Sequence, residues 1–237
     1  MAIIGTGATA VQCVPHVGAA AQQLYVFQRT PSSIDVRNNQ PTDPSWMSTQ
    51  EPGWQNERRR NFESVMTGAP VKEDMVADGW TEAFRLLFGS LQNKAPSKWR
   101  MAMWAITAVV SKDFYQQGLK TYLTKKATKF MNLAEEMELA DYRKMEQVRA
   151  RADQVVEDAD TAEALKPYYR QFCKRPCFHD EYLPTYNRPN VTLVNTDGKG
   201  VDQITKNGIV FDGKEYAVDC IIFATGFEVG TDYSRRA

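Results

Sequence analysis

Short apolar runs near the start of the chain predict two strands of a parallel sheet. Residues 2–4 are apolar, and residues 24–28 form a second run rich in aromatic and β-branched side chains. Between them, residues 8–21 have the alanine, valine and glutamine content of a helix that packs closely on a sheet. The order of strand, glycine-rich turn, helix and strand predicts the first half of a βαβ unit.

The middle of the chain has a different pattern. Residues 31–54 are polar and interrupted by prolines, which predicts an irregular segment. Between residues 56 and 169 no convincing strand is found, and apolar residues recur at helical spacing instead. The periodic stretches are Trp80, Phe84 and Leu87, then residues 99–110, then Met145, Val148, Ala152 and Val155. We interpret these stripes as helix core, so this region is predicted to be a helical insertion between parts of the sheet.

Strand patterns return after Pro176. Residues 191–194 form one strand, and residues 201–218 hold short alternating segments. These segments are separated by Asn207-Gly208 and Asp212-Gly213, dipeptides that favour tight hairpins. The continuous apolar run at residues 220–224 is typical of a strand buried on both faces of a parallel sheet.

Composition narrows the class of protein without naming it. The chain has 237 residues, of which 43% are hydrophobic and 24% charged, as in globular proteins. Lys+Arg and Asp+Glu are equal at 29 each, so no net charge attracts nucleic acid or an anionic membrane. The apolar run at residues 101–110 is about half as long as a membrane span. With no signal-peptide pattern, we expect a cytoplasmic protein that binds neither nucleic acid nor membrane.

The four cysteines are too few and too scattered for a disulfide scaffold. Cys173, Cys177 and His179 offer three metal ligands at irregular spacing, with no second pair to complete four. We therefore expect reduced cysteines and no metal site.

The turn after the first strand carries a dinucleotide-binding pattern. Gly5 permits a tight turn, Gly7 lets a pyrophosphate approach the backbone, and Ala10 lets the helix lie close to the sheet. The phosphates would meet unpaired N–H groups and the positive end of the helix dipole. A glycine turn without a ligand is the alternative. The candidate cofactor-binding residues of this turn are Gly5, Thr6, Gly7, Ala8, Thr9, Ala10 and Gln12.

The end of the second strand indicates which dinucleotide is bound. FAD and NAD sites place a carboxylate there to accept hydrogen bonds from the ribose hydroxyls. This chain has Arg29 followed by Thr30 at that place, and a guanidinium binds a 2′-phosphate that a carboxylate would repel. The pattern favours NADPH, with a solvated surface arginine as the alternative.

These elements predict an α/β fold, in which a Rossmann-like dinucleotide-binding domain contains a largely helical insertion. The NADPH-binding domain is predicted over residues 1–55 and 170–237, and its second part is expected to include strands that lead back toward a neighbouring domain. The insertion is predicted over residues 56–169.

Four stretches together resemble the NADPH domain of the type I Baeyer–Villiger monooxygenases, flavoproteins related to the flavin-containing monooxygenases. They are GTGATAVQ, VFQRTPSSIDVRNN, CKRPCFHDEYLPTYNRPNVTLV and CIIFATGF. The resemblance implies NADPH and FAD as cofactors and a small-molecule ketone and O2 as substrates. In that chemistry NADPH reduces FAD, and one oxygen of O2 is inserted beside the ketone carbonyl to give an ester or a lactone.

The resemblance also implies roles for single residues. Lys174 matches a lysine that helps to hold the 2′-phosphate, and Arg175 matches a catalytic arginine that reaches the flavin. Thr225 and Gly226 match a cofactor-binding motif where the two nucleotide domains meet. Without the resemblance, Lys174 and Arg175 would be interpreted as surface cations. For Gly226, a glycine that only ends the strand is the alternative. His179 and Asp180 are assigned no catalytic part.

The sequence also departs from the family. The family's N-terminal FAD domain, with its own glycine turn, and a histidine fingerprint ahead of the NADPH turn have no counterpart in this sequence. We therefore expect an incomplete or truncated member that lacks the main FAD-binding domain. Two alternatives remain at this point: an NADPH-binding remnant without turnover, and an unrelated NADPH reductase whose helical insertion supplies the substrate site.

Overall fold

The computed structural model describes residues 1–92 and 127–227, and the chain divides into two compact units. Unit 1 comprises Met1–Val36 and Met145–Ala237, and unit 2 comprises Arg37–Lys144. Helix α6 (Ala127–Val155) continues from unit 2 into unit 1. The chain passes from one unit to the other at residues 36–37 and 144–145. The domain boundaries expected from the sequence lie at residues 55–56 and 169–170.

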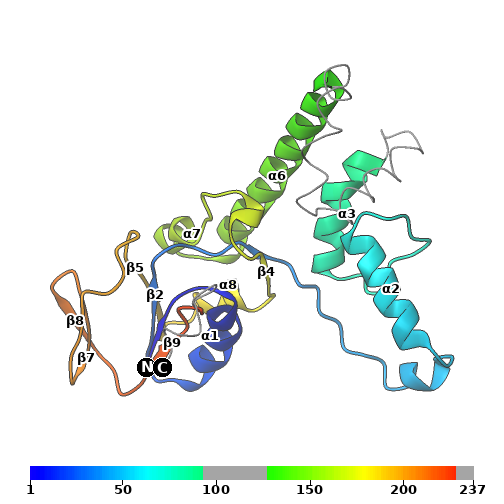
Figure 1. The fold of residues 1–237 in the computed structure, drawn as a ribbon. Helices are drawn as coiled ribbons and strands as arrows, with labels where there is room; N and C mark the ends of the chain where they lie inside the picture. Colours follow the sequence, from blue (N-terminus) through cyan, green and yellow to red (C-terminus); the bar gives the residue numbers. More distant parts are fainter. Residues whose placement is uncertain (93–126, 228–237) are drawn as a thin grey trace, which may run out of the picture. The chain divides into compact units, whose positions relative to one another are not determined.

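A parallel sheet forms the centre of unit 1, and its strands lie in the order β5-β2-β1-β9 (Figure 1). In register, Ala2 lies opposite both Tyr25 and Ile221, and Leu24 lies opposite Val191. The strands predicted at residues 2–4, 24–28 and 191–194 are confirmed, and so is the mixed α/β class. The four strands are β1 (Ala2–Ile4), β2 (Leu24–Gln28), β5 (Val191–Asn195) and β9 (Ile221–Phe223).

Helices cover one face of this sheet. Helix α1 (Ala8–Ala20) buries Ala10, Val11 and Val14 in the same apolar cluster as Ile3 of β1. The cluster also holds residues of α7 (Ala159–Ala164) and α8 (Tyr182–Thr185). In the part of α6 that belongs to unit 1, Met145, Val148 and Ala152 are buried, which confirms that this stripe is helix core.

Gly18 lets α1 approach its neighbours closely. A Cβ at this position would lie 2.9 Å from Cγ2 of Thr185 and 3.1 Å from Cγ2 of Val191. The side-chain amide of Asn190 donates hydrogen bonds to the carbonyls of Gly18 and Ala21 at 2.9 and 2.8 Å. The carbonyl end of α1 is thus satisfied by a side chain from the loop that leads into β5.

A small antiparallel sheet covers the other face. It consists of β6 (Gln203–Ile204), β7 (Gly208–Phe211) and β8 (Lys214–Ala217). The Tyr216 ring packs edge-on against Tyr25 and Phe27, at centroid distances of 5.1 and 5.2 Å. The sequence predicted these hairpins, and Asp212-Gly213 forms the second turn with φ values of 49° and 72°.

The first hairpin differs from the expectation in one respect. Gly208 is the first residue of β7 and not part of the turn. A side chain there would collide with the carbonyl of Tyr216 on the facing strand, so close backbone approach is what requires glycine.

The expectation that residues 220–224 are buried on both faces is wrong. Ile221 and Ile222 are half-buried, and Phe223 is 63% exposed. Among the described residues, β9 pairs with β1 alone and is an edge strand, which leaves much of its surface uncovered.

Two short strands lie beside the main sheet. Strand β3 (Ile34–Asp35) pairs in parallel with β4 (Cys177–Phe178). The guanidinium of Arg151 on α6 donates to the carbonyls of Ile34 and His179, at 3.2 and 3.1 Å. Arg151 therefore links β3 to the residue that follows β4.

In unit 2 the described residues form helices and no strand. The elements are η1 (Trp46–Thr49), α2 (Trp54–Met66), α3 (Gly79–Gln92) and the first part of α6. The helix predicted at residues 99–110 lies outside the described residues. The rings of Trp46 and Trp54 meet edge to face at 4.7 Å, inside the segment expected to be irregular.

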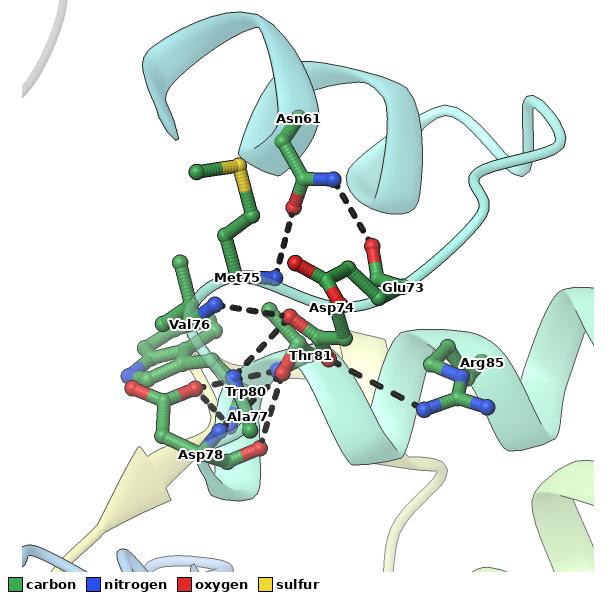
Figure 2. Close-up of polar contacts among 10 residues, drawn as sticks. All are labelled: Asn61, Glu73, Asp74, Met75, Val76, Ala77, Asp78, Trp80, Thr81 and Arg85. Atoms are coloured by element: carbon green, nitrogen blue, oxygen red, sulfur yellow. Dashed lines mark hydrogen bonds and ion pairs between the residues drawn. The ribbon is translucent and has the colours of Figure 1, made fainter. Parts of the chain in front are cut away.

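Polar contacts fix the loop between α2 and α3 (Figure 2). Asn61 on α2 accepts a hydrogen bond from Met75 N–H at 3.0 Å and donates one to the Glu73 carbonyl at 2.8 Å. Asp78 precedes α3, and its carboxylate accepts from the N–H groups of Trp80 and Thr81. The helix therefore begins at a side-chain cap.

Asp74 is the most buried carboxylate of this loop network, with 5% of its side chain exposed. One oxygen accepts from the N–H groups of Val76 and Ala77 at 3.0 and 2.9 Å. Burial is the largest single influence and raises the pKa of Asp74. Hydrogen bonds from Ala77, Thr81 and Val76 and the charge of Arg85 outweigh it, so the pKa is lowered overall.

We expect Asp74→Ala to destabilise unit 2 by roughly 1–3 kcal/mol, because two N–H groups lose a charged acceptor. All five tryptophans lie between residues 46 and 104, so tryptophan fluorescence during urea unfolding reports on this unit. Because the folded pKa is depressed, the stabilisation is present above the ordinary aspartate pKa and is lost as pH falls through the folded value.

Asp43→Ala is the matched control. Asp43 accepts hydrogen bonds from Ser45 in a similar way but lies in an exposed segment. An equal loss of stability in both variants would contradict the role of the buried Asp74.

Candidate functional site

The glycine turn lies where β1 ends and α1 begins. Gly5 has a φ of 109°, and a Cβ there would collide with the carbonyl oxygen of Ala224. Gly7 is exposed, and a Cβ there would meet nothing within 4 Å. The two glycines therefore serve different purposes: the first satisfies a steric demand of the fold, and the second leaves the start of α1 open.

The start of α1 has no side-chain cap. Gly7 is the N-cap residue and forms no side-chain hydrogen bond, and its carbonyl accepts from Val11 N–H at 2.9 Å. The N–H groups of the first turn lack partners within the helix and carry its positive partial charge. Ala8 is half-buried and Ala10 fully buried, while Thr9 and Gln12 are exposed.

Thr6 and Thr30 join the turn after β1 to the turn after β2. The hydroxyl of the buried Thr6 donates to the Thr30 carbonyl at 2.7 Å. The hydroxyl of Ser32 donates to the Thr6 carbonyl in return. The structure thus shows a positioning contact for both predicted residues.

Thr225 and Gly226 follow β9 at the same edge of the sheet. Ala224 N–H donates to the Ile4 carbonyl at 2.9 Å, which places the start of this segment beside Gly5. Both residues are exposed, and Gly226 has a φ of 93°, a conformation that favours glycine.

Arg29 and Lys174 are far apart in sequence, and Tyr169 links the segments that carry them. Its hydroxyl binds the loop after Arg29, and its ring centroid lies 5.1 Å from Nζ of Lys174. Burial and then the charge of Arg29 lower the pKa of Lys174. Among the described residues, neither cation forms an ion pair with a carboxylate. Two neighbouring positive charges that remain uncompensated form a suitable site for a doubly charged anion.

Arg175 is exposed, and its side chain acts electrostatically on Cys177. Burial raises the pKa of the Cys177 thiol, and the positive charge of Arg175 opposes this shift. Cys177 N–H donates to the Ser33 carbonyl at 3.0 Å, so the strand after Arg175 is bound to the loop that follows Arg29.

His179 is half-buried next to this strand. Burial is the main cause of its lowered pKa, and its Nδ1 accepts from Glu181 N–H at 3.1 Å. These contacts describe a packed, neutral imidazole in a turn.

A groove of about 750 Å³ opens at the carboxyl ends of β2 and β5. Arg29 lines it together with Asn195, which ends β5, and with Asp197 and Gly198 that follow. Its other cations have partners: Lys166 pairs with Asp153 and Glu163, and Arg149 with Glu146. The remaining lining residues are Pro31, Glu163, Ala164, Pro167 and Tyr168.

Apart from Arg29, the sequence did not indicate the residues that line this groove. It also did not indicate Tyr169, whose hydroxyl binds the loop after Arg29. The lining residues come from four separate segments of the chain, so no local spacing reveals them. The one available signal was the topology, because ligands of parallel sheets bind beyond the carboxyl ends of the strands.

The described residues contain neither a metal-binding cluster nor a membrane-spanning helix. No group of three or more His, Cys, Asp or Glu side chains is placed to hold a metal ion. Within residues 1–92 and 127–227, no helix combines the length and the apolar character needed to span a bilayer.

The fold and the site define an α/β protein with a glycine-rich turn and paired cations at the carboxyl edge of a parallel sheet. No protein-family model matches the chain. It is 50% identical over 234 residues to the Baeyer–Villiger monooxygenase ATR8 of Stachybotrys chlorohalonatus, which covers 99% of this chain and 33% of that protein.

Solved structures agree with this similarity. The polycyclic ketone monooxygenase of Thermothelomyces thermophila aligns with a TM-score of 0.69 and 41% identity, covering 95% of this chain and 32% of that one. The enzyme OTEMO in complex with FAD and NADP aligns with a TM-score of 0.58 and 27% identity, covering 96% and 37%. Over nearly its whole length, the chain is thus a homologue of Baeyer–Villiger monooxygenases, which confirms the predicted resemblance. It spans about a third of the length of these relatives.

We expect Gly5→Ala to destabilise unit 1 by at least roughly 1–3 kcal/mol, the usual cost of such backbone strain. Gly7→Ala is the matched control, because its φ of −75° suits alanine and the added methyl group meets no atom. Thermal unfolding followed by circular dichroism measures both. Equal melting temperatures for the two variants would contradict the assigned roles.

Proposed function

We propose that this chain provides the NADPH-binding part of a Baeyer–Villiger monooxygenase. In this proposal unit 1 is a Rossmann-like dinucleotide-binding domain, and unit 2 is the largely helical insertion. The enzyme inserts one oxygen of O2 beside the carbonyl of a small-molecule ketone and releases an ester or a lactone.

The position of Lys174 beside the loop that follows Arg29, where Tyr169 contacts both, is the observation that carries the proposal. A carboxylate at the end of β2 would select FAD or NAD, and this chain has a guanidinium there. The second cation comes from a segment distant in sequence, and among the described residues neither has a carboxylate partner. This arrangement supports binding of the 2′-phosphate that distinguishes NADPH from NADH.

The start of α1 fits the pyrophosphate. Gly7 presents no side chain, and the first-turn N–H groups of the helix are available for hydrogen bonds to phosphate oxygens. In this proposal Gly5, Thr6, Ala8, Thr9, Ala10 and Gln12 form the surrounding turn, and Thr30 positions it through Thr6.

We expect Arg29→Ala and Lys174→Ala each to weaken NADPH binding about ten- to a hundredfold, the equivalent of one lost charged hydrogen bond. NADH binding should change little, because NADH carries no 2′-phosphate. Titration of the purified chain with both nucleotides measures the two dissociation constants.

Arg188→Ala is the control, since Arg188 is an exposed arginine of unit 1 that belongs to none of the predicted site residues. If Arg29→Ala weakened NADPH and NADH binding by the same factor, the 2′-phosphate role would be wrong.

Baeyer–Villiger chemistry also requires FAD, and OTEMO, a structural neighbour, binds both FAD and NADP. The bound cofactors supply the electrons and the activated oxygen. In our proposal Thr225 and Gly226 lie where the two cofactors meet. Arg175 holds a fixed positive charge that reaches the flavin and stabilises the negative charge developing during oxygen transfer.

The local structure is consistent with such a role for Arg175. Its guanidinium is exposed, so it can reach a bound group. Two residues further on, Cys177 N–H donates to the Ser33 carbonyl and attaches this segment to the loop after Arg29. A charge on a fixed segment needs little reorganisation when the reaction occurs.

A chimera tests this catalytic proposal. The chain would replace the matching third of the polycyclic ketone monooxygenase, and FAD absorbance would show that the chimera folds. We expect it to oxygenate a ketone with NADPH, and Arg175→Ala to lower the rate by roughly 10²–10³-fold while FAD and NADPH still bind.

Arg188→Ala in the same chimera is the control for an exposed arginine. An Arg175→Ala chimera with an unchanged oxygenation rate would show that Arg175 has no catalytic role.

A further inference from the structure

We propose that Tyr169 is a positioning residue for the 2′-phosphate site, and that it controls selectivity for NADPH over NADH by supporting both Arg29 and Lys174. This inference rests on the proposed NADPH-binding function. Tyr169 itself is not proposed to touch the nucleotide.

The hydroxyl of Tyr169 holds the loop that follows Arg29. It donates a hydrogen bond to the Pro31 carbonyl at 2.9 Å and accepts one from Ser33 N–H at 3.0 Å. Burial is the main cause that raises the pKa of Tyr169 to about 12, so the hydroxyl remains a donor at neutral pH. Two residues of one short loop are thereby fixed to a single atom.

The ring of Tyr169 supports the other cation. Nζ of Lys174 lies 5.1 Å from the ring centroid, within the range of a cation–π interaction. The negative face of the ring attracts the ammonium without neutralising it. The ring therefore restricts the position of Lys174 without supplying a countercharge.

Tyr169 thus connects the two segments that carry the cations. One segment runs from Arg29 to Ser33, and the other contains Lys174 and leads to Cys177, whose N–H binds the Ser33 carbonyl. The neighbouring Tyr168 is 75% exposed, whereas Tyr169 is half-buried, so the two adjacent tyrosines differ in exposure.

The two parts of the side chain make separable predictions. Loss of the ring acts through Lys174, and loss of the hydroxyl acts through the loop after Arg29. Both affect only ligands that carry a 2′-phosphate. A purely structural role would instead weaken all nucleotides equally.

The test compares 2′,5′-ADP with 5′-AMP, which differ only by the 2′-phosphate, in calorimetric titrations of the full chain. We expect Tyr169→Leu to lower the ratio of the two affinities by at least roughly two- to fivefold, the equivalent of a lost cation–π contact. In a Lys174→Ala background, the part of this loss that acts through the ring should disappear.

Tyr169→Phe keeps the ring and removes the hydroxyl. We expect a smaller loss of selectivity, which persists in the Lys174→Ala background and disappears in the Arg29→Ala background. If Tyr169→Leu does not fold, this variant alone decides, and an unchanged ratio would overturn the inference.

Lys214→Ala is the matched control, because Lys214 also lies over a tyrosine ring, that of Tyr216, at 4.7 Å. It belongs to the antiparallel sheet, and its loss should leave the ratio unchanged. Equal weakening of both ligands by Tyr169→Leu would also overturn the inference. If the unmodified chain binds both ligands equally, the proposed NADPH function itself fails, and the inference fails with it.

Discussion

The carbonyl of Ala224 leaves no room for a side chain at residue 5, and the geometry of the sheet's carboxyl edge depends on this steric constraint. Strand β1 has parallel neighbours on both sides, so the chain that leaves it must pass between the ends of β2 and β9. Only a glycine with positive φ can make this turn at such short range. The direction of α1 and the position of the Thr6 hydroxyl follow from it.

The cations in and near the groove are of two kinds: some form ion pairs with carboxylates, and others do not. Lys166 and Arg149 form short ion pairs with nearby carboxylates, and these contacts stabilise the loops locally. Among the described residues Arg29 and Lys174 have no carboxylate partner. Tyr169 holds the loop after Arg29 and places its ring beside Lys174. The proposed cofactor preference thus depends on which cations have carboxylate partners, although the chain as a whole has no net charge.

Local patterns predicted most of the sheet. The strands at residues 2–4, 24–28 and 191–194, the hairpins and the buried stripe of α6 follow from alternation, helical periodicity and turn residues. The glycine turn was found because its spacing is local. Arg29 could be predicted because the residue at the end of β2 contacts the ribose or its 2′-phosphate in dinucleotide-binding folds.

Features that depend on packing between distant segments were not predicted. The burial of β9 could not be predicted, because an apolar run shows only that a strand can be buried. Whether it is buried depends on the elements packed around it, and among the described residues β9 pairs with β1 alone. Gly18 and Gly208 owe their identity to Thr185 and to Tyr216, which no sequence pattern connects to them. The role of Tyr169 likewise exists only because two separate loops meet at its ring and hydroxyl.

The edge position of β9 has a practical consequence for the chain as a separate polypeptide. Among the described residues no strand pairs with its open side, which lies beside an exposed phenylalanine, Phe223. Such an edge is a template for pairing with another strand, including that of a second copy. Association through this edge would increase with the concentration of the polypeptide.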